Sequence, residues 1–204
     1  GNSASCSFEI TVIDNEDPSI SCPTDITVSN DAGICGADVT YTLPIGTDNC
    51  PGAATVQSIG LGSGSIFPVG TTTETFVVTD AAGNSSGCSF DITVNDNEYP
   101  VISCPLDVNQ TAITGKCEAP VVVVPIASFT DNCTLGTISN DFNSGGPDAS
   151  GTYQVGLTVV EFTATDQYGN MATCLVNINI TDDEDPTITC PSDITVSADA
   201  GQCS

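Results

Sequence analysis

The segment Ser89-Phe90-Asp91-Ile92-Thr93-Val94, followed by the acidic run Asp96-Asn97-Glu98-Tyr99-Pro100, decides the fold class. Its apolar and polar residues alternate with the period of two that is typical of a half-buried β-strand. The same alternation occurs at residues 7–12. Turn residues separate further predicted strands at 26–29, 38–43, 55–59 and 72–79. No stretch has the pattern of a helix, so the sequence predicts an all-β chain of antiparallel β-sandwiches.

Internal repeats organise the chain, because four classes of cysteine recur in step. The classes are Cys6, Cys88 and Cys174; Cys22, Cys104 and Cys190; Cys35, Cys117 and Cys203; and Cys50 with Cys133. Successive members of the first three classes lie 82 and then 86 residues apart, and Pro18, Pro100 and Pro186 follow the same register. We therefore predict complete repeats at 18–99 and 100–185. Residues 1–17 would be the last strand and linker of a preceding repeat, and residues 186–204 the start of a following one.

The net charge of the chain restricts the kinds of partner that it can bind. Its 204 residues include 26 acidic side chains, one lysine and no arginine or histidine, for a net charge of −25. Such a chain lacks the basic surface that nucleic acids and anionic membranes require, and no apolar run approaches the roughly 18 residues of a membrane span. Without histidine it also lacks a serine-type triad, so we expect no enzyme. Cations are the expected partners.

The cysteine content indicates the compartment. Eleven cysteines without metal-finger spacing are typical of an oxidising environment, so we expect an extracellular or cell-surface protein. Each repeat of roughly 80 residues can bury only a little over 60% of its unfolded surface. Covalent cross-links would therefore add stability that a small core does not supply.

Six ordered motifs carry a resemblance to a known family. They are Cys22-Pro23, Gly33-Ile34-Cys35, Thr47-Asp48-Asn49-Cys50, Phe67-Pro68-Val69-Gly70-Thr71-Thr72, Thr79-Asp80-Ala81-Ala82-Gly83-Asn84 and Cys88-Ser89-Phe90. Together they resemble the HYR (hyalin repeat) module, an immunoglobulin-like extracellular β-sandwich. The resemblance covers the whole chain and implies tandem, disulfide-bonded sandwiches. The second copy departs from the family pattern at Tyr153-Gln154 and at Gly115-Lys116-Cys117.

The resemblance also implies a disulfide pattern. An immunoglobulin-like order places the first and last strands side by side, which pairs Cys22 with Cys88 and leaves Cys35 with Cys50. In the second repeat the corresponding pairs are Cys104 with Cys174 and Cys117 with Cys133. However, Cys35 and Cys50 flank one strand, and only a short strand would keep their Cα atoms within the ~7 Å limit of a disulfide. A bridge from Cys22 to Cys50, with Cys35 paired elsewhere, for example with another module, stays open.

Acidic and amide side chains gather where repeats meet. Carboxylate and amide oxygens are the ligands that Ca²⁺ prefers, and the acidic linkers are similar to the calcium-binding linkers of cadherins. The resemblance places the two acidic loops of each repeat at the end where the preceding linker arrives. The predicted ligands are Asp14, Asn15, Glu16, Asp17, Asp48, Asn49, Asp80, Asn84, Asp96, Asn97, Glu98, Asp131, Asn132, Asp166, Asn170, Asp182, Asp183, Glu184 and Asp185. The alternative is that these residues are ordinary turn formers and solvated linkers.

These features predict an extracellular structural or adhesive segment whose linkers Ca²⁺ stiffens into a rod or surface fibre. Its partners would be neighbouring repeats of the same chain, with lateral self-association into fibres through exposed edge strands. One alternative is an adhesin whose modules bind a receptor or glycan directly. Another is a passive spacer attached to a secreted enzyme.

Overall fold

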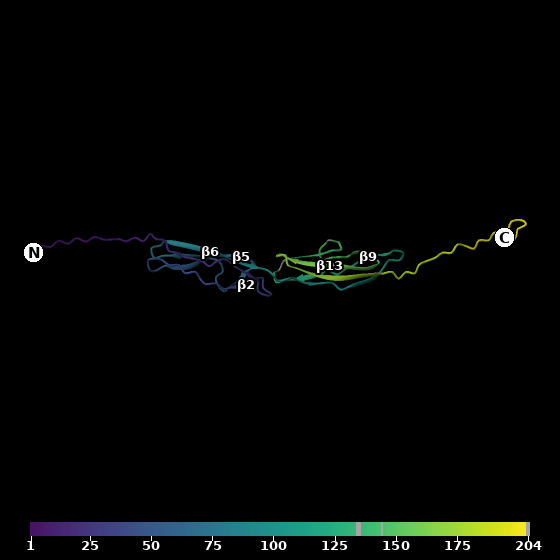
Figure 1. The fold of residues 1–204 in the computed structure, drawn as a ribbon, viewed down its shortest axis with the longest axis horizontal. Helices are drawn as coiled ribbons and strands as arrows, with labels where there is room; N and C mark the ends of the chain where they lie inside the picture. The colour runs from purple at the N-terminus through teal and green to yellow at the C-terminus, as the bar shows by residue number, and fades with distance from the viewer. Residues whose placement is uncertain (134–135, 144, 203–204) are drawn as a thin grey trace.

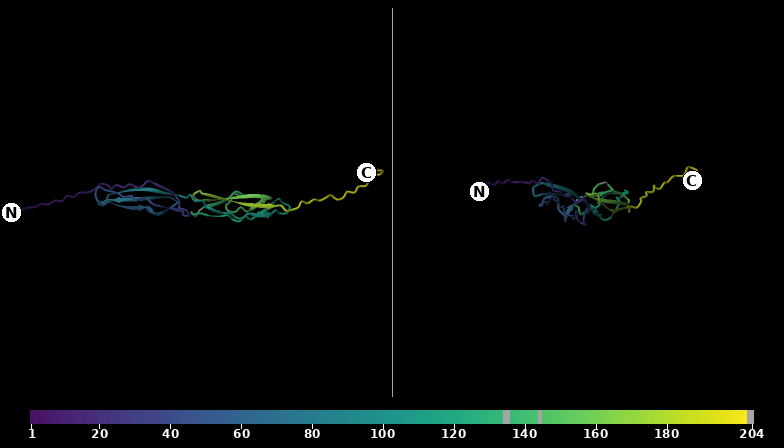
Figure 2. Two further views of the ribbon diagram at one scale, coloured as in Figure 1. Left: turned by 60° about the horizontal axis from the view of Figure 1, so that its bottom comes forward. Right: turned by 60° about the vertical axis from the view of Figure 1, so that its left-hand side comes forward.

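A computed structural model of the chain describes residues 1–133, 136–143 and 145–202, without the side chain of Val121. Two β-sandwiches follow each other end to end along the long axis of the molecule, and extended segments leave at both ends (Figures 1 and 2). All regular elements of the described residues are strands, as the alternation predicts. No helix in this part of the chain is long and apolar enough to cross a membrane.

The first sandwich consists of two sheets. Its strands are β1 (Ile26–Ser29), β2 (Gly36–Val39), β3 (Ala54–Ile59), β4 (Ser65–Pro68), β5 (Gly70–Thr79) and β6 (Ser85–Asn95). One sheet has the order β1-β6-β5-β3, and the other pairs β2 with β4. β1 runs parallel to β6, and the other pairs are antiparallel. The first and last strands therefore lie side by side, as expected of an immunoglobulin-like order.

The second sandwich repeats this topology. Its strands are β7 (Val101–Ser103), β8 (Val108–Thr111), β9 (Glu118–Val122), β10 (Ser128–Thr130), β11 (Gly136–Asn140), β12 (Gly151–Gln154), β13 (Gly156–Asp166) and β14 (Met171–Thr181). Its larger sheet has the order β11-β13-β14-β8, and β9 pairs with β12. The short pair β7–β10 has its counterpart in the bridge between Ser19 and Thr47 of the first sandwich.

Each sandwich has its own core, which the strand alternation creates. Phe90, Ile92 and Val94 of β6 point inward and are almost fully buried, while their neighbours along the strand are more exposed. In β14 the corresponding residues, Val176, Ile178 and Ile180, are buried in the same way. The two cores share no buried residue, so each sandwich is a separate hydrophobic unit.

Two disulfides lie within the sandwiches. Cys22 is bonded to Cys88 and Cys104 to Cys174, with Cα–Cα distances of 5.6 and 6.1 Å, in agreement with the expected pairing. Both bridges extend the parallel pairing of the first and last strands. Since they join the chain just after it enters a sandwich to its last strand, they close almost the whole module into one loop.

The expected bridges from Cys35 to Cys50 and from Cys117 to Cys133 are wrong. Cys35 is bonded to Cys133 of the second sandwich, with a Cα–Cα distance of 4.9 Å. The loop before Cys35 contacts the outgoing linker, whereas Cys50 lies beside Asp14 of the incoming one. Cys35 and Cys50 are therefore at opposite ends of the first sandwich, and no intramodular bridge can join them.

The alternating residues 7–12 do not form a strand. Phe8, Ile10 and Val12 are 84, 77 and 90% exposed, although the equivalent residues of β6 form a core. β6 is held by neighbours on both sides, β1 and β5. Among the described residues, no strand pairs with residues 7–12 on either side, so their apolar side chains stay exposed to solvent.

Candidate metal centre at the junction between sandwiches

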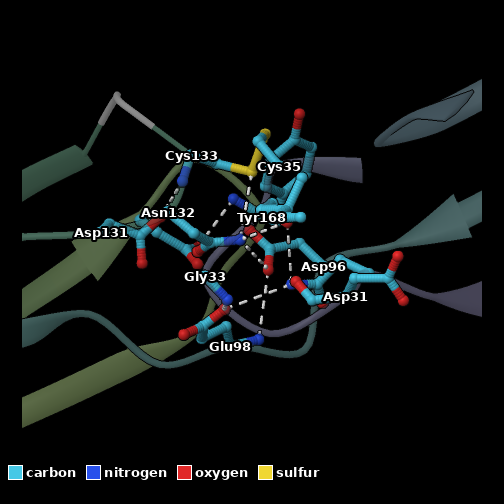
Figure 3. Close-up of a disulfide and its surroundings, with 12 residues drawn as sticks. Asp31, Gly33, Cys35, Asp96, Glu98, Asp131, Asn132, Cys133 and Tyr168 are labelled. Carbon is cyan, nitrogen blue, oxygen red and sulfur yellow. Dashed lines mark hydrogen bonds between the residues drawn. A yellow bond between two sulfur atoms is a disulfide. The ribbon is translucent and has the colours of Figure 1, made fainter. Parts of the chain in front are cut away.

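The central junction brings together the linker and two loops of the second sandwich, as predicted. Asp96 comes from the linker after β6, while Asp131 and Asn132 come from the loop between β10 and β11 (Figure 3). One carboxylate oxygen each from Asp96 and Asp131 and the sulfur of Cys133 lie within 4.8 Å of one another. That sulfur is bonded to Cys35 and is no thiolate ligand. The oxygens are thus the atoms available to a metal ion.

Several oxygens of this cluster are buried without a hydrogen-bond donor among the described residues. They are Asp96 Oδ2, Asp131 Oδ2 and Asn132 Oδ1. Buried polar atoms in proteins are almost always paired, and a pair of unpaired carboxylate oxygens is especially costly. The donor set consists of hard oxygen atoms, which fits Ca²⁺ and does not fit a softer metal.

The cluster carries several negative charges, and no basic side chain of the described residues lies beside it. Burial raises the pKa of Asp131 above its ordinary value, and the negative charges of Asp96, Asp166 and Glu98 raise it further. A hydrogen bond from the Cys133 backbone acts in the opposite direction. Lys116 is the only basic side chain of the sequence, and it lies with Glu184 at the far end of the second sandwich. A cation from solution is therefore the available counter-charge.

Asp166 is held in place by hydrogen bonds within its own loop. Its carboxylate accepts hydrogen bonds from the backbone of Tyr168 and Asn170 and from Asn170 Nδ2, at 2.7–2.8 Å. Burial alone raises its pKa, but these hydrogen bonds outweigh burial and lower the pKa below the ordinary value. Asn170 Nδ2 also donates to the carbonyl of Asp96 at 3.3 Å. The pair thus closes the loop between β13 and β14 and fastens it to the linker.

The junction before the first sandwich repeats this arrangement. Asp14 and Asp48 approach each other with Cys50, and Asp48 Oδ1 is buried without a donor in the described part of the chain. Asn84 joins Asp80 to the Asp14 carbonyl with the same contacts as Asn170. In addition, Asn49 donates to Glu16 at 2.6 Å. The predicted convergence of linker and loops therefore occurs in both copies.

Other predicted ligands face the preceding sandwich or solvent. Glu98 accepts from Gly33 N at 2.8 Å and from Asn30 Nδ2 at 3.4 Å, and Asn97 donates to Ser29. Glu184 accepts in the same way from Gly115 N. Asp182 is exposed and accepts from Glu184 N at 3.1 Å. The remaining predicted ligands are exposed and make no side-chain hydrogen bond among the described residues: Asn15, Asp17, Asp183 and Asp185.

The sequence reasoning missed the contribution of the preceding sandwich. The loop after β1 supplies Gly33 and Cys35 to the junction (Figure 3). Asn30 of the same loop also contacts the linker, through Glu98. Asn132 Nδ2 donates across to the carbonyl of Ile34 at 3.2 Å. The recurrence of Gly33-Ile34-Cys35 as Gly115-Lys116-Cys117 marked this loop in the sequence, but did not reveal that it faces the next module.

Comparison with known proteins identifies relatives of the same repeat type. The chain is 33% identical over 209 residues to hyalin of Strongylocentrotus purpuratus, covering 98% of this chain and 17% of that protein. Hyalin of Lytechinus variegatus is 34% identical, with coverage of 94 and 37%. A rat sushi, von Willebrand factor type A, EGF and pentraxin domain-containing protein is 32% identical, with coverage of 82 and 4%. The chain thus spans well under half of each of these relatives, and none of their names denotes an enzyme.

Solved structures of similar shape include mouse cadherin-23 EC22-24, with a TM-score of 0.38 at 13% identity, covering 81% of this chain and 67% of that chain. Drosophila N-cadherin EC1-4 has a TM-score of 0.36 at 13% identity, covering 81 and 50%.

The three disulfides and the relatives place the protein outside the cell or at its surface. The HYR domain model matches residues 13–94 and again residues 95–180. The chain therefore belongs to the HYR domain family.

Proposed function

We propose that this chain is an extracellular structural or adhesive repeat segment in which Ca²⁺ at each junction stiffens consecutive sandwiches into a rod. In this proposal the repeat units run from 18 to 99 and from 100 to 185. The observation that carries the proposal is the cluster of donor-free buried oxygens at Asp96, Asp131 and Asn132, which has no basic side chain to neutralise it.

Asp96, Asp131 and Asn132 would hold the ion at the central junction, and Asp14, Asp48 and Asn49 one at the junction before it. When bound, the ion supplies positive charge and takes up the unpaired oxygens. Asp166 and Asn170 position the cluster, because they fix the loop between β13 and β14 against the linker backbone.

Stiffening follows from where these residues lie. Asp96 belongs to the linker and Asp131 to the second sandwich, so an ion between them restricts rotation of the linker. Without the ion, the charges of Asp96, Asp131, Asp166 and Glu98 repel one another. Affinity in the range of other extracellular modules, about 10⁻⁴–10⁻³ M, would keep such sites filled in a calcium-rich medium. Lateral association into fibres stays a prediction.

Calcium titration by isothermal calorimetry tests the site. We expect the chain to bind Ca²⁺, and the double substitution Asp96→Asn and Asp131→Asn to abolish binding at the central junction. Glu161→Gln is the matched control, because it removes one exposed charge from β13. Unchanged stoichiometry in the double variant would contradict the assignment of these ligands.

Small-angle X-ray scattering under non-reducing conditions tests the stiffening. We expect chelator to shorten the maximum dimension, since the linkers then bend more. The bridge from Cys35 to Cys133 also restrains the central linker, so the change should be larger in a Cys35→Ser, Cys133→Ser variant. Equal profiles with calcium and with chelator in both proteins would show that the linker acids are only solvating charge.

A further inference from the structure

The bridge between Cys35 and Cys133 joins two cysteine positions that recur in successive repeats, so the same bridge can form at other junctions. Cys35 and Cys117 occupy the same position in successive repeats, as do Cys50 and Cys133. The observed bridge joins the Cys35 position of one module to the Cys50 position of the next. Among the described residues, Cys117 and Cys50 are the remaining cysteines at these two positions, and both are unbonded and exposed in the structure.

The loop that carries Cys117 shares its backbone hydrogen bonds with the loop that carries Cys35, although the side-chain hydrogen bonds of Asn30 have no counterpart at Ala112. Ile34 N donates to the Asp31 carbonyl at 3.0 Å, and Lys116 N to the Ile113 carbonyl at 2.9 Å. The linker glutamate after each module then accepts from the glycine of the loop, Glu98 from Gly33 and Glu184 from Gly115. Both glycines have similar positive φ angles, 72° and 75°. Cys117 is therefore held in the conformation in which Cys35 forms its bridge.

The loop that carries Cys50 matches that of Cys133 in the same way. Cys50 N donates to the Asp48 carboxylate at 3.0 Å, and Cys133 N to the Asp131 carboxylate at 2.9 Å. In both copies the sulfur lies beside a linker aspartate, Asp14 or Asp96. Each half of the bridge thus takes its bonding geometry from its own module, without the partner module in place.

We propose that Cys117 forms a disulfide with the cysteine of the next module that corresponds to Cys133, and that Cys50 bonds to the cysteine of the preceding module that corresponds to Cys35. Every junction is then crossed by two covalent connections, the linker and a bridge. Forming each bridge oxidises two thiols. In thiol–disulfide exchange with an oxidant of the disulfide class, the oxidant accepts the two electrons and two protons and leaves as two thiols.

The parallel connections protect the array from a single break. Cys22–Cys88 and Cys104–Cys174 close each module into a loop, and Cys35–Cys133 joins one loop to the next. A cut in the linker between the sandwiches therefore leaves the modules attached. This property rests on the disulfides and is independent of the calcium site.

An extended chain tests the proposal. Residues 1–189 are followed directly by residues 22–99, so that the added Cys22 takes the place of Cys190 and a complete third module follows the second. Thiols are alkylated before denaturation, and bridged peptides are identified by mass spectrometry without reduction. The added segment repeats residues 22–99, so its peptides have the same masses as the native ones, and the Cys50→Ser variant of the added module shows which copy bonds to Cys117. We expect a peptide that joins Cys117 to a Cys50 segment, alongside the bridge from Cys35 to Cys133. The absence of alkylated Cys22 and Cys88 reports that the third module has folded.

Cys50→Ser in the added module alone is the matched control, and we expect it to convert Cys117 into an alkylated thiol while all other bridges persist. Alkylation of both Cys117 and the added Cys50 in the unmutated extended chain, with the third module folded, would overturn the proposal. A bridge from Cys117 to a second molecule, seen as a dimer on a non-reducing gel, would overturn it as well.

Discussion

In the first sandwich a buried carboxylate holds the loop between β3 and β4, whereas in the second a buried amide holds the equivalent loop between β11 and β12. Glu74 of β5 is fully buried and accepts hydrogen bonds from Tyr41, Gln57 and the backbone of Leu61 and Gly62. Burial, together with the hydrogen bond and charge of Glu74, raises the pKa of Tyr41. The carboxylate is thus paired on both oxygens.

The equivalent position in the second sandwich is Val160, which is fully buried in the core. Here Asn140, at the end of β11, accepts from the backbone of Phe142 and Asn143 and donates to the carbonyls of Gly145, Gly146 and Asp148. Phe142 stacks on Tyr153 at a centroid distance of 4.1 Å. Either solution works because a buried polar group stabilises a loop when all of its hydrogen bonds are made.

In contrast, the loops between β5 and β6 and between β13 and β14 contact the linker through the same hydrogen bonds in both sandwiches. Asp80 with Asn84 and Asp166 with Asn170 make matching contacts to the linker. The interior of a module can therefore change without affecting how it meets its neighbour. Substitutions in one interior should stay within that sandwich.

The largest effect is expected from Glu74→Ala. It leaves the hydroxyl of Tyr41, the amide of Gln57 and two backbone N–H groups without their acceptor, and should destabilise the first sandwich by about 3–5 kcal/mol. Hydrogen exchange measured by mass spectrometry should show loss of protection in β5 and unchanged protection in β13. Glu74→Gln, which keeps one oxygen, should cost less. Equal loss in both sandwiches would show that their interiors are coupled.

Asn140→Ala should destabilise the second sandwich and leave the first unchanged. The expected loss of stability is about 2–3 kcal/mol, because the groups that lose their partners are neutral. Protection should fall in β11 and β13 and persist in β5. Asn140→Asp separates the two halves of the network, since it keeps the acceptors for Phe142 and Asn143 and loses the donor to the carbonyls. If the Asp variant is as stable as the unmutated chain, the hydrogen bonds from Phe142 and Asn143 are sufficient to hold the loop.

A smaller effect, on the pH dependence of stability, is expected where β8 pairs with β14 at the edge of the larger sheet. The side-chain and backbone hydrogen bonds from Asn177 lower the pKa of Asp107 below its ordinary value in the second sandwich. This contribution to stability is complete above the unfolded-state pKa, about 4, and is lost as pH falls through the lower folded value. Asn177→Ala should weaken the acid dependence of urea unfolding for the second sandwich.

Asn179→Ala is the matched control for this titration. Asn179 lies in β14 like Asn177, but its side chain donates to the neutral Asn109. The first sandwich has Asp91 in place of Asn177, and its backbone N–H donates to Asp25, the counterpart of Asp107. An identical pH profile for Asn177→Ala and the unmutated chain would contradict a role for this hydrogen bond in acid stability.

Local sequence pattern was sufficient for the sandwich class, the repeat and most strands. The alternation in β6 specifies which residues enter the core, because successive side chains of a strand point to opposite faces. The pairing of Cys22 with Cys88 followed instead from the resemblance to the HYR module, which implies a topology with neighbouring first and last strands. The meeting of Asp14 with Asp48, and of Asp96 with Asp131, followed from the ends at which their loops lie.

Other contacts between elements that are distant in the chain were not predicted. The pairing of Cys35 with Cys133 depends on how the linker orients one module against the next, which no local pattern encodes. The same holds for Glu74, whose partners in three separate segments converge only after folding, and for residues 7–12, whose alternation forms a strand only beside paired neighbours. Strand and turn preferences arise within a few residues, whereas cross-links and buried polar networks require surfaces that exist only once the modules are folded and docked.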